Sequence, residues 1–143
     1  MRQIEFGLKH NLPLMLHCRD SYGDVLEILN SYKDDSKLRG NVHFFAGTLE
    51  EAKAFWDLGF TISFTGVITF ARNYDEVTRA APIGMIMSET DAPFVAPAPY
   101  RGKRNEPSYV IEVVKKIAEI RNEDFESVRR EMVENAIRVF NLK

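Results

Sequence analysis

The sequence lacks the features that mark secreted, membrane-spanning and polyanion-binding proteins. It has one cysteine, Cys18, so no disulfide can form within the chain, and a reducing compartment, the cytoplasm, is expected. The first residues lack the apolar run of a signal peptide, and no segment approaches the roughly 20 apolar residues that span a membrane. The net charge of −2 gives no general basic surface for nucleic acid. A nucleic-acid site would therefore be local or would depend on bound cations.

Two common catalytic motifs are also missing. No serine lies in a nucleophile elbow, and no glycine-rich loop of the P-loop or dinucleotide type occurs. What is present is the composition of a globular protein, with 45% hydrophobic and 28% charged residues in a length of 143. We expect residues 1–143 to form a single domain, because this length leaves no room for a second one.

Short apolar runs alternate with amphipathic segments along the chain. The runs have the length of strands and recur at intervals of about 25 residues, which is typical of βα units. Continuous apolar strands followed by amphipathic helices indicate a parallel sheet covered by helices, an α/β fold. Two helix starts carry the spacing of a capping box, Ser21 with Asp24 and Thr48 with Glu51. The predicted strands are residues 12–18, 41–45, 60–64 and 84–88.

Helices are also predicted at the two ends of the chain. Residues 4–10 read as the tail of a helix, and residues 107–118 and 124–140 carry helical apolar stripes after a long loop at 90–105. Four βα units are half of an eight-stranded barrel of the TIM type, which typically needs about 250 residues. A half-barrel of four strands would have two open edges.

Three residues that can bind metals follow or end the predicted strands. His17 and His43 lie in the first two strands, and Asp91 follows the fourth. In parallel βα folds the sites lie at the carboxyl ends of the strands, and imidazole with carboxylate is a donor set for zinc, manganese or magnesium. Two interpretations remain open, because a strand histidine is often a core residue and Asp91 can be a turn residue before Pro93.

Two further groups of residues are candidates. Glu89 lies two residues before Asp91, so alternation puts both on the same side of an extended segment, where they could share a metal or a proton. The loop before residue 107 carries Arg101 and Arg104, and arginine forks favour phosphate oxygens. The alternative for this loop is a solvated basic surface with Asn105 as a helix cap.

Several segments together have a more specific pattern. Residues 88–94 read Ser-Glu-Thr-Asp-Ala-Pro-Phe, and residues 97–107 read Pro-Ala-Pro-Tyr-Arg-Gly-Lys-Arg-Asn-Glu-Pro. Residues 12–20 end in Leu-His-Cys-Arg-Asp, and residues 41–47 read Asn-Val-His-Phe-Phe-Ala-Gly. In this order and without large gaps, these segments resemble the TatD family of metal-dependent hydrolases, which are amidohydrolase-like barrels.

The resemblance implies a function and a role for each candidate residue. The implied activity is a metal-dependent deoxyribonuclease that cleaves DNA phosphodiester bonds, often exonucleolytically, with divalent zinc, magnesium or manganese ions. His17, His43 and Asp91 would be metal ligands, and Asp91 and Glu89 would form the catalytic pair, Asp91 also positioning the attacking water and Glu89 supporting the ligands. The implied substrate-binding residues lie near the DNA phosphate: Arg19, Arg101, Arg104 and Asn105.

The sequence also departs from the family pattern. A His-x-His strand and a bridging glutamate are expected from the N-terminal half of the family's barrel, and neither occurs in this sequence. The chain therefore resembles the C-terminal half, strands five to eight, and would supply only part of the site. One alternative is a non-catalytic half-barrel that forms a homodimer or complements an N-terminal half-barrel. Another is hydrolysis of an amide or lactone.

Overall fold

The computed structural model describes residues 1–142, so Lys143, the last residue of the expected domain, lies outside the described part. Its centre is a four-stranded sheet in the order β1-β2-β3-β4, with every neighbouring pair parallel. The four expected strands are confirmed, with ends that shift by a few residues. Their bounds are β1 Leu14–His17, β2 Gly40–His43, β3 Phe60–Phe64 and β4 Ile86–Ser88.

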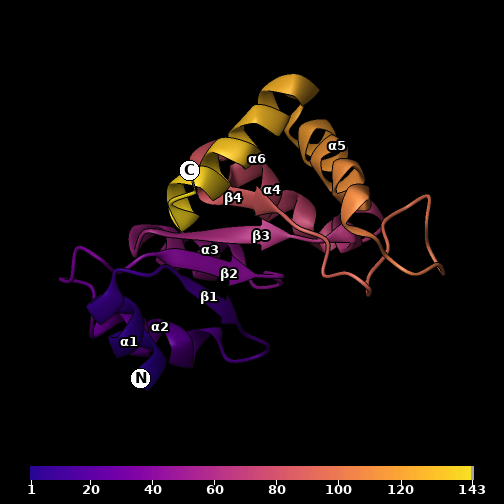
Figure 1. The fold of residues 1–143 in the computed structure, drawn as a ribbon. Coiled ribbons are helices and arrows are strands. Elements are labelled where there is room, and N and C mark those ends of the chain that lie inside the picture. The colour runs from indigo at the N-terminus through magenta and orange to yellow at the C-terminus, as the bar shows by residue number, and fades with distance from the viewer. Residues whose placement is uncertain (143) are drawn as a thin grey trace.

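Helices connect the strands and pack against one another in chain order, α2 on α3, α3 on α4, α4 on α5 and α5 on α6. The helices α1 and α2 lie on the side of β1, whereas α5 and α6 lie on the side of β4 (Figure 1). No helix within residues 1–142 is long and apolar enough to cross a membrane. The α-helices are α1 Arg2–His10, α2 Tyr22–Asn30, α3 Leu49–Asp57, α4 Asp75–Ala80, α5 Val110–Arg121 and α6 Phe125–Phe140. Short 3-10 turns occupy η1 Gly66–Thr69, η2 Arg72–Tyr74, η3 Ile83–Met85 and η4 Pro107–Tyr109.

The two predicted capping boxes have different outcomes. At the start of α3 the Glu51 backbone N–H donates to Thr48 Oγ1 at 3.2 Å, and the Thr48 N–H donates to Glu51 Oε2 at 2.7 Å, which confirms that box. At the start of α2 the prediction is wrong, because the Ser21 side chain makes no cap hydrogen bond. Its hydroxyl lies 3.3 Å from Cys18 Sγ instead. A nearby hydrogen-bonding partner thus competes with capping.

Alternation along the strands gives the sheet two different faces. One face, here called the apolar face, carries buried side chains that pack against the helices, with Phe60 of β3 and Phe55 of α3 at a ring-centroid separation of 6.5 Å. The opposite face, here called the polar face, carries the hydrophilic side chains of β2 and β3 together with His17 and His43. The strand residues of the apolar face are Leu14, Leu16, Val42, Phe60, Ile62, Phe64 and Ile86.

Candidate metal centre

The carboxyl ends of β1, β2 and β4 bring the predicted ligands to one place. His17 and His43 are direct partners in the parallel register of β1 and β2, and their ring centroids lie 5.7 Å apart. Glu89 and Asp91 follow the last residue of β4, and both reach His43. Strand ends that are far apart in sequence therefore meet at one edge of the sheet, as the position of sites in parallel βα folds predicts.

Glu89 contacts the Nδ1 side of the His43 ring. Its Oε2 lies 2.5 Å from His43 Nδ1, while Oε1 accepts hydrogen bonds from the Phe44 backbone N–H at 2.6 Å and the Ser63 hydroxyl at 2.7 Å. A carboxylate oxygen accepts hydrogen bonds and has no hydrogen to donate, so the hydrogen of its contact with His43 comes from the imidazole. We therefore assign the hydrogen to His43 Nδ1, which leaves the lone pair of Nε2 free.

His43 Nε2 faces Asp91, and the separation of the two side chains suits a shared ion. The distance from Nε2 to Asp91 Oδ1 is 3.6 Å, too long for a hydrogen bond. Two ligands of one tetrahedral zinc, each about 2.1 Å from the ion, would lie roughly 3.4 Å apart. The donor chemistry and the spacing of this pair therefore fit a divalent metal.

The set of ligands is nevertheless incomplete. Within residues 1–142, no group of three or more His, Cys, Asp or Glu side chains is arranged to hold a metal ion. His17 is exposed at the end of β1 and does not join the His43–Asp91 pair in such a group. The described residues thus offer two converging donors and a third nearby.

Unusual backbone conformations surround these ligands. Asp20, Phe44 and Asp91 follow the ends of β1, β2 and β4, and all have positive φ, at 55°, 49° and 56°. This left-handed region is disfavoured for residues other than glycine, and for a bulky residue such as Phe44 it costs about 1–3 kcal/mol. The turn at Phe44 directs its N–H to Glu89. The strain is therefore coupled to a contact that orients His43.

The loop after β4, which carries Arg101 and Arg104, packs against residues 66–70, the segment that follows β3. Gly66 permits this close approach, because a Cβ atom there would lie 2.4 Å from the Val95 carbonyl oxygen. The Ala98 N–H donates to Thr69 Oγ1 at 2.8 Å. The guanidinium carbon of Arg101 lies 3.5 Å from the ring centroid of Phe70, a cation–π contact that fixes the direction of this arginine.

The predicted substrate-binding residues occupy different surroundings. Arg19 and Arg104 are exposed, and Arg19 lines a small cavity of about 200 Å³ together with His17. Asn105 is buried, and its amide is used by the loop itself. Its Nδ2 donates to the carbonyl oxygens of Thr90 at 2.7 Å and Phe94 at 2.6 Å. Asn105 braces the loop, and its amide is not free to bind a phosphate.

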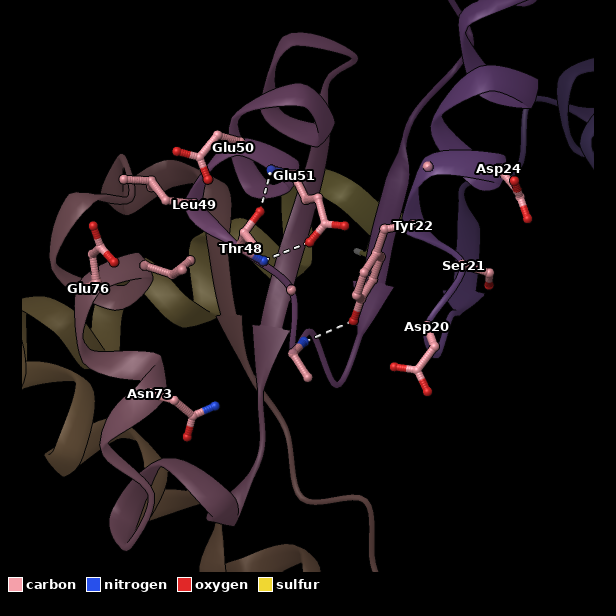
Figure 2. Close-up of a pocket in the computed structure, with 14 residues that line it drawn as sticks. Asp20, Ser21, Tyr22, Asp24, Thr48, Leu49, Glu50, Glu51, Asn73 and Glu76 are labelled. Atoms are coloured by element: carbon pink, nitrogen blue, oxygen red, sulfur yellow. Dashed lines mark hydrogen bonds between the residues drawn. The ribbon is translucent and has the colours of Figure 1, made fainter.

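An acidic cavity adjoins the small cavity that His17 lines, since both are lined by Asp20, Tyr22 and Ala46. It has a volume of about 700 Å³ and lies where α2 and α3 begin, near η2 and α4 (Figure 2). Among residues 1–142, those that line it include no lysine or arginine, so the cavity is unsuited to a phosphodiester. First-turn carboxylates complement the helix dipoles, which accounts for several of these acids. The acidic residues are Asp20, Asp24, Glu50, Glu51 and Glu76.

Sequence reasoning missed the polar partners of Glu89. Ser63 lies in β3, where apolar periodicity draws attention to the core, and its contact with Glu89 joins residues 26 apart in sequence. A signal was present, because Asn41, Thr61 and Ser63 interrupt the apolar runs of two buried strands. Hydrophilic residues at alternate positions indicate a polar face.

Comparison with known proteins identifies the family of the chain. Residues 1–141 match the TatD related DNase family. The chain is 39% identical over 142 residues to the uncharacterized metal-dependent hydrolase YabD of Bacillus subtilis, covering 98% of this chain and 55% of that protein. It is 35% identical over 145 residues to the uncharacterized metal-dependent hydrolase YcfH of Escherichia coli K12, covering 99% of this chain and 54% of that protein. The chain thus spans about half the length of these relatives.

Solved structures support the fold class. The crystal structure of YJJV, a TatD homolog from Escherichia coli K12, superposes with a TM-score of 0.90 at 26% identity, covering 99% of this chain and 54% of that one. A TatD family hydrolase of Entamoeba histolytica superposes with a TM-score of 0.84 at 22% identity, covering 97% and 54%. These likenesses confirm an α/β half-barrel of four parallel strands. The chain belongs to the TatD related DNase family.

Proposed function

We propose that this chain contributes part of the active site of a divalent-metal-dependent hydrolase that cleaves DNA phosphodiester bonds, with exonucleolytic cleavage as the favoured mode. The observation that carries the proposal is the position of His43 between two carboxylates. Glu89 lies 2.5 Å from Nδ1, and Asp91 lies 3.6 Å from Nε2. This arrangement presents one imidazole lone pair and one carboxylate oxygen to the same point, while the other carboxylate fixes the ring.

The residues of this chain would have distinct roles. His43 and Asp91 would hold a zinc, manganese or magnesium ion with His17 as the third donor, and the bound ion would activate water and offset phosphate charge. Asp91 is also partly exposed, so its carboxylate can orient an attacking water and accept its proton. Glu89 would keep His43 in the ligating tautomer. Arg101, held over Phe70, would bind a phosphate oxygen, with Arg19 and Arg104 as further cationic contacts.

A complementary half-barrel is the proposed partner. Among residues 1–142, β1 and β4 each have one sheet neighbour, so each leaves an open edge. Met15 on β1 is 58% exposed, and Val133 and Ile137 of α6 are exposed large apolar side chains. We propose that residues 1–143 form one folding unit whose edges are covered by an N-terminal half-barrel or by a second copy. The single cysteine supports a cytoplasmic location.

A chimaera tests this function. The N-terminal part of the Bacillus subtilis relative that this chain does not match would be fused to residues 1–143, and release of nucleotides from labelled single-stranded DNA would be measured with and without Mn²⁺. We expect Mn²⁺-dependent cleavage that is lost in the Asp91→Asn chimaera. The isolated chain should bind the ion weakly and cleave little.

The result that would contradict the proposal is specific. A chimaera that is folded by circular dichroism and binds Mn²⁺, but leaves single-stranded DNA intact, would overturn the nuclease assignment. Hydrolysis of amide or lactone substrates by the same chimaera would then identify another substrate class. Size-exclusion chromatography of the isolated chain distinguishes the partner, because a dimer indicates a second copy covering the edges.

A further inference from the structure

A line of hydrogen bonds crosses the polar face and ends on Glu89. Thr61 Oγ1 donates to Asn41 Oδ1 at 3.0 Å, and Asn41 Nδ2 donates to Ser63 Oγ at 2.8 Å. The Ser63 hydroxyl lies 2.7 Å from Glu89 Oε1, and the other oxygen of Glu89 faces His43. Strands β2 and β3 and the segment directly after β4 thus contribute to one line that starts in the middle of the sheet and reaches His43.

The direction of each donor follows from the chemistry of these groups. Ser63 Oγ receives the Asn41 amide hydrogen, so its own single hydrogen is free for another acceptor. The Val42 carbonyl oxygen lies 3.3 Å away, whereas the Glu89 carboxylate is closer, at 2.7 Å, and charged. Hydrogen bonds to ionised acceptors are the shorter and stronger ones. The hydrogen of Ser63 therefore goes to Glu89.

Burying the polar side chains of Thr61, Asn41 and Ser63 costs free energy unless each is hydrogen-bonded. Thr61 is 0%, Asn41 2% and Ser63 2% exposed, in strands whose alternate residues are apolar. Parallel strands buried on both faces usually carry valine, isoleucine and leucine, and a buried polar group is tolerated only when it is hydrogen-bonded. All three are hydrogen-bonded here, and their bonds lead to the carboxylate that touches His43.

We propose that Ser63 and Asn41, oriented by Thr61, are positioning residues for His43 and act through Glu89. Asn41 directs the Ser63 hydroxyl toward Glu89 Oε1, and this bond holds the carboxylate where Oε2 accepts from His43 Nδ1–H. The ring is thereby fixed with Nε2 toward Asp91. The identity of the ion that Nε2 meets rests on the proposed function, whereas the positioning itself is a property of the metal-free chain.

Nuclear magnetic resonance of the metal-free chain tests the positioning. The sequence has three histidines, so ¹⁵N-labelled imidazoles give few signals, and His43→Gln assigns the signal of that ring. At a pH well above about 6.5, the ordinary imidazole pKa, the wild-type His43 ring should carry its hydrogen on Nδ1. In Ser63→Ala, and more weakly in Asn41→Ala, the Nε2–H tautomer should rise severalfold. Ser63→Thr keeps the hydroxyl and should restore the wild-type signal.

Co²⁺ titration of the same variants gives the second measurement, with Thr78→Val as the control. Thr78 Oγ1 is buried and donates to the Tyr74 carbonyl oxygen at 2.7 Å, so this control loses a buried hydroxyl hydrogen bond away from the polar face. Loss of a group that supports a ligand typically weakens metal binding about 10- to 100-fold. We expect at least a tenfold loss for Ser63→Ala, recovery in Ser63→Thr and no loss in Thr78→Val.

The outcomes separate the two proposals. If Ser63→Ala keeps the wild-type tautomer and the Co²⁺ affinity of Thr78→Val, the positioning role is wrong. If the wild-type chain binds no Co²⁺ but the tautomer shifts in Ser63→Ala, the positioning role holds and the proposal that this chain alone binds a divalent ion is wrong. Should Ser63→Ala unfold, Asn41→Ala decides in its place by the same two measurements.

Discussion

The two faces of the sheet are built from alternate residues of the same strands, yet one packs against helices and the other forms hydrogen bonds. The apolar face carries Val42 and Ile62, which are buried against the helices. The polar face carries Asn41 and Ser63, which are equally buried but hydrogen-bonded. Burial on the apolar face stabilises the fold, whereas the buried side chains of the polar face fix one side chain, Glu89, through hydrogen bonds.

The largest expected effect is on the apolar face. Phe55 is 0% exposed and packs against the rings of Tyr22, Phe45 and Phe60. Phe55→Ala should reduce the free energy of unfolding by about 3–5 kcal/mol, because it removes a buried ring and leaves a cavity. Urea denaturation followed by circular dichroism measures this. If Phe55→Ala lost less free energy of unfolding than Ser63→Ala, the apolar face would not be the main source of stability.

A smaller effect of another kind is expected at the candidate metal centre. Glu89→Gln keeps the shape of the side chain but replaces an oxygen that faces a donor with an amide N–H group. Metal affinity should fall about 10- to 100-fold, which corresponds to about 1.4–2.8 kcal/mol. Isothermal titration with Mn²⁺ gives the affinity. Equal Mn²⁺ binding by Glu89→Gln and the wild-type chain would show that Glu89 does not support the ligand.

Two helix starts provide a matched comparison on the helical side of the molecule. Thr48→Ala removes a cap hydrogen bond of α3 and should reduce stability by about 1 kcal/mol. Ser21→Ala removes a side chain that caps nothing in α2, so its effect should stay within about 0.5 kcal/mol. Both are measured by urea denaturation. Equal losses would mean that Ser21 caps α2 in solution.

The smallest effect is a pH dependence at the start of α6. Hydrogen bonds from the Ser127 backbone and side chain lower the pKa of the Asp124 carboxyl below its ordinary value of 3.8. A lowered pKa in the folded state stabilises the fold above the ordinary value, and this stabilisation is lost as the pH falls through the lowered one. Asp124→Asn should flatten that part of the profile of thermal midpoint against pH below about pH 4, where an ordinary aspartate carboxyl begins to take up its proton. An unchanged profile would contradict this role.

The order of helices and strands could be predicted from the sequence, but the contacts of each side chain could not. Apolar periodicity located β3 at residues 60–64, and the Thr48–Glu51 spacing identified the start of α3, because both signals are local. The burial of Asn105 could not be predicted, because it depends on how the loop folds back on Thr90 and Phe94. The predicted cap at Ser21 is wrong because the Ser21 hydroxyl contacts Cys18 Sγ instead. Such contacts depend on tertiary packing, which local patterns do not encode.

The sequence likewise predicts some features of the candidate metal centre and not others. His17, His43 and Asp91 could be selected because the ends of parallel strands share one edge of a sheet. The contact between Ser63 and Glu89 could not, because it needs the register of β3 against β4. Alternation showed that Glu89 and Asp91 share a side, but the assignment of one to each nitrogen of His43 required coordinates.

The most direct test of the account is an anomalous difference map from a crystal of this chain soaked in MnCl₂. We predict a peak within coordinating distance of His43 Nε2 and Asp91 Oδ1, with Glu89 still on Nδ1. Titration of Asp91→Asn and Glu89→Gln in solution should then show weaker binding. A peak among the carboxylates of the acidic cavity near Asp20 and Glu51, with none at His43, would contradict the central claim.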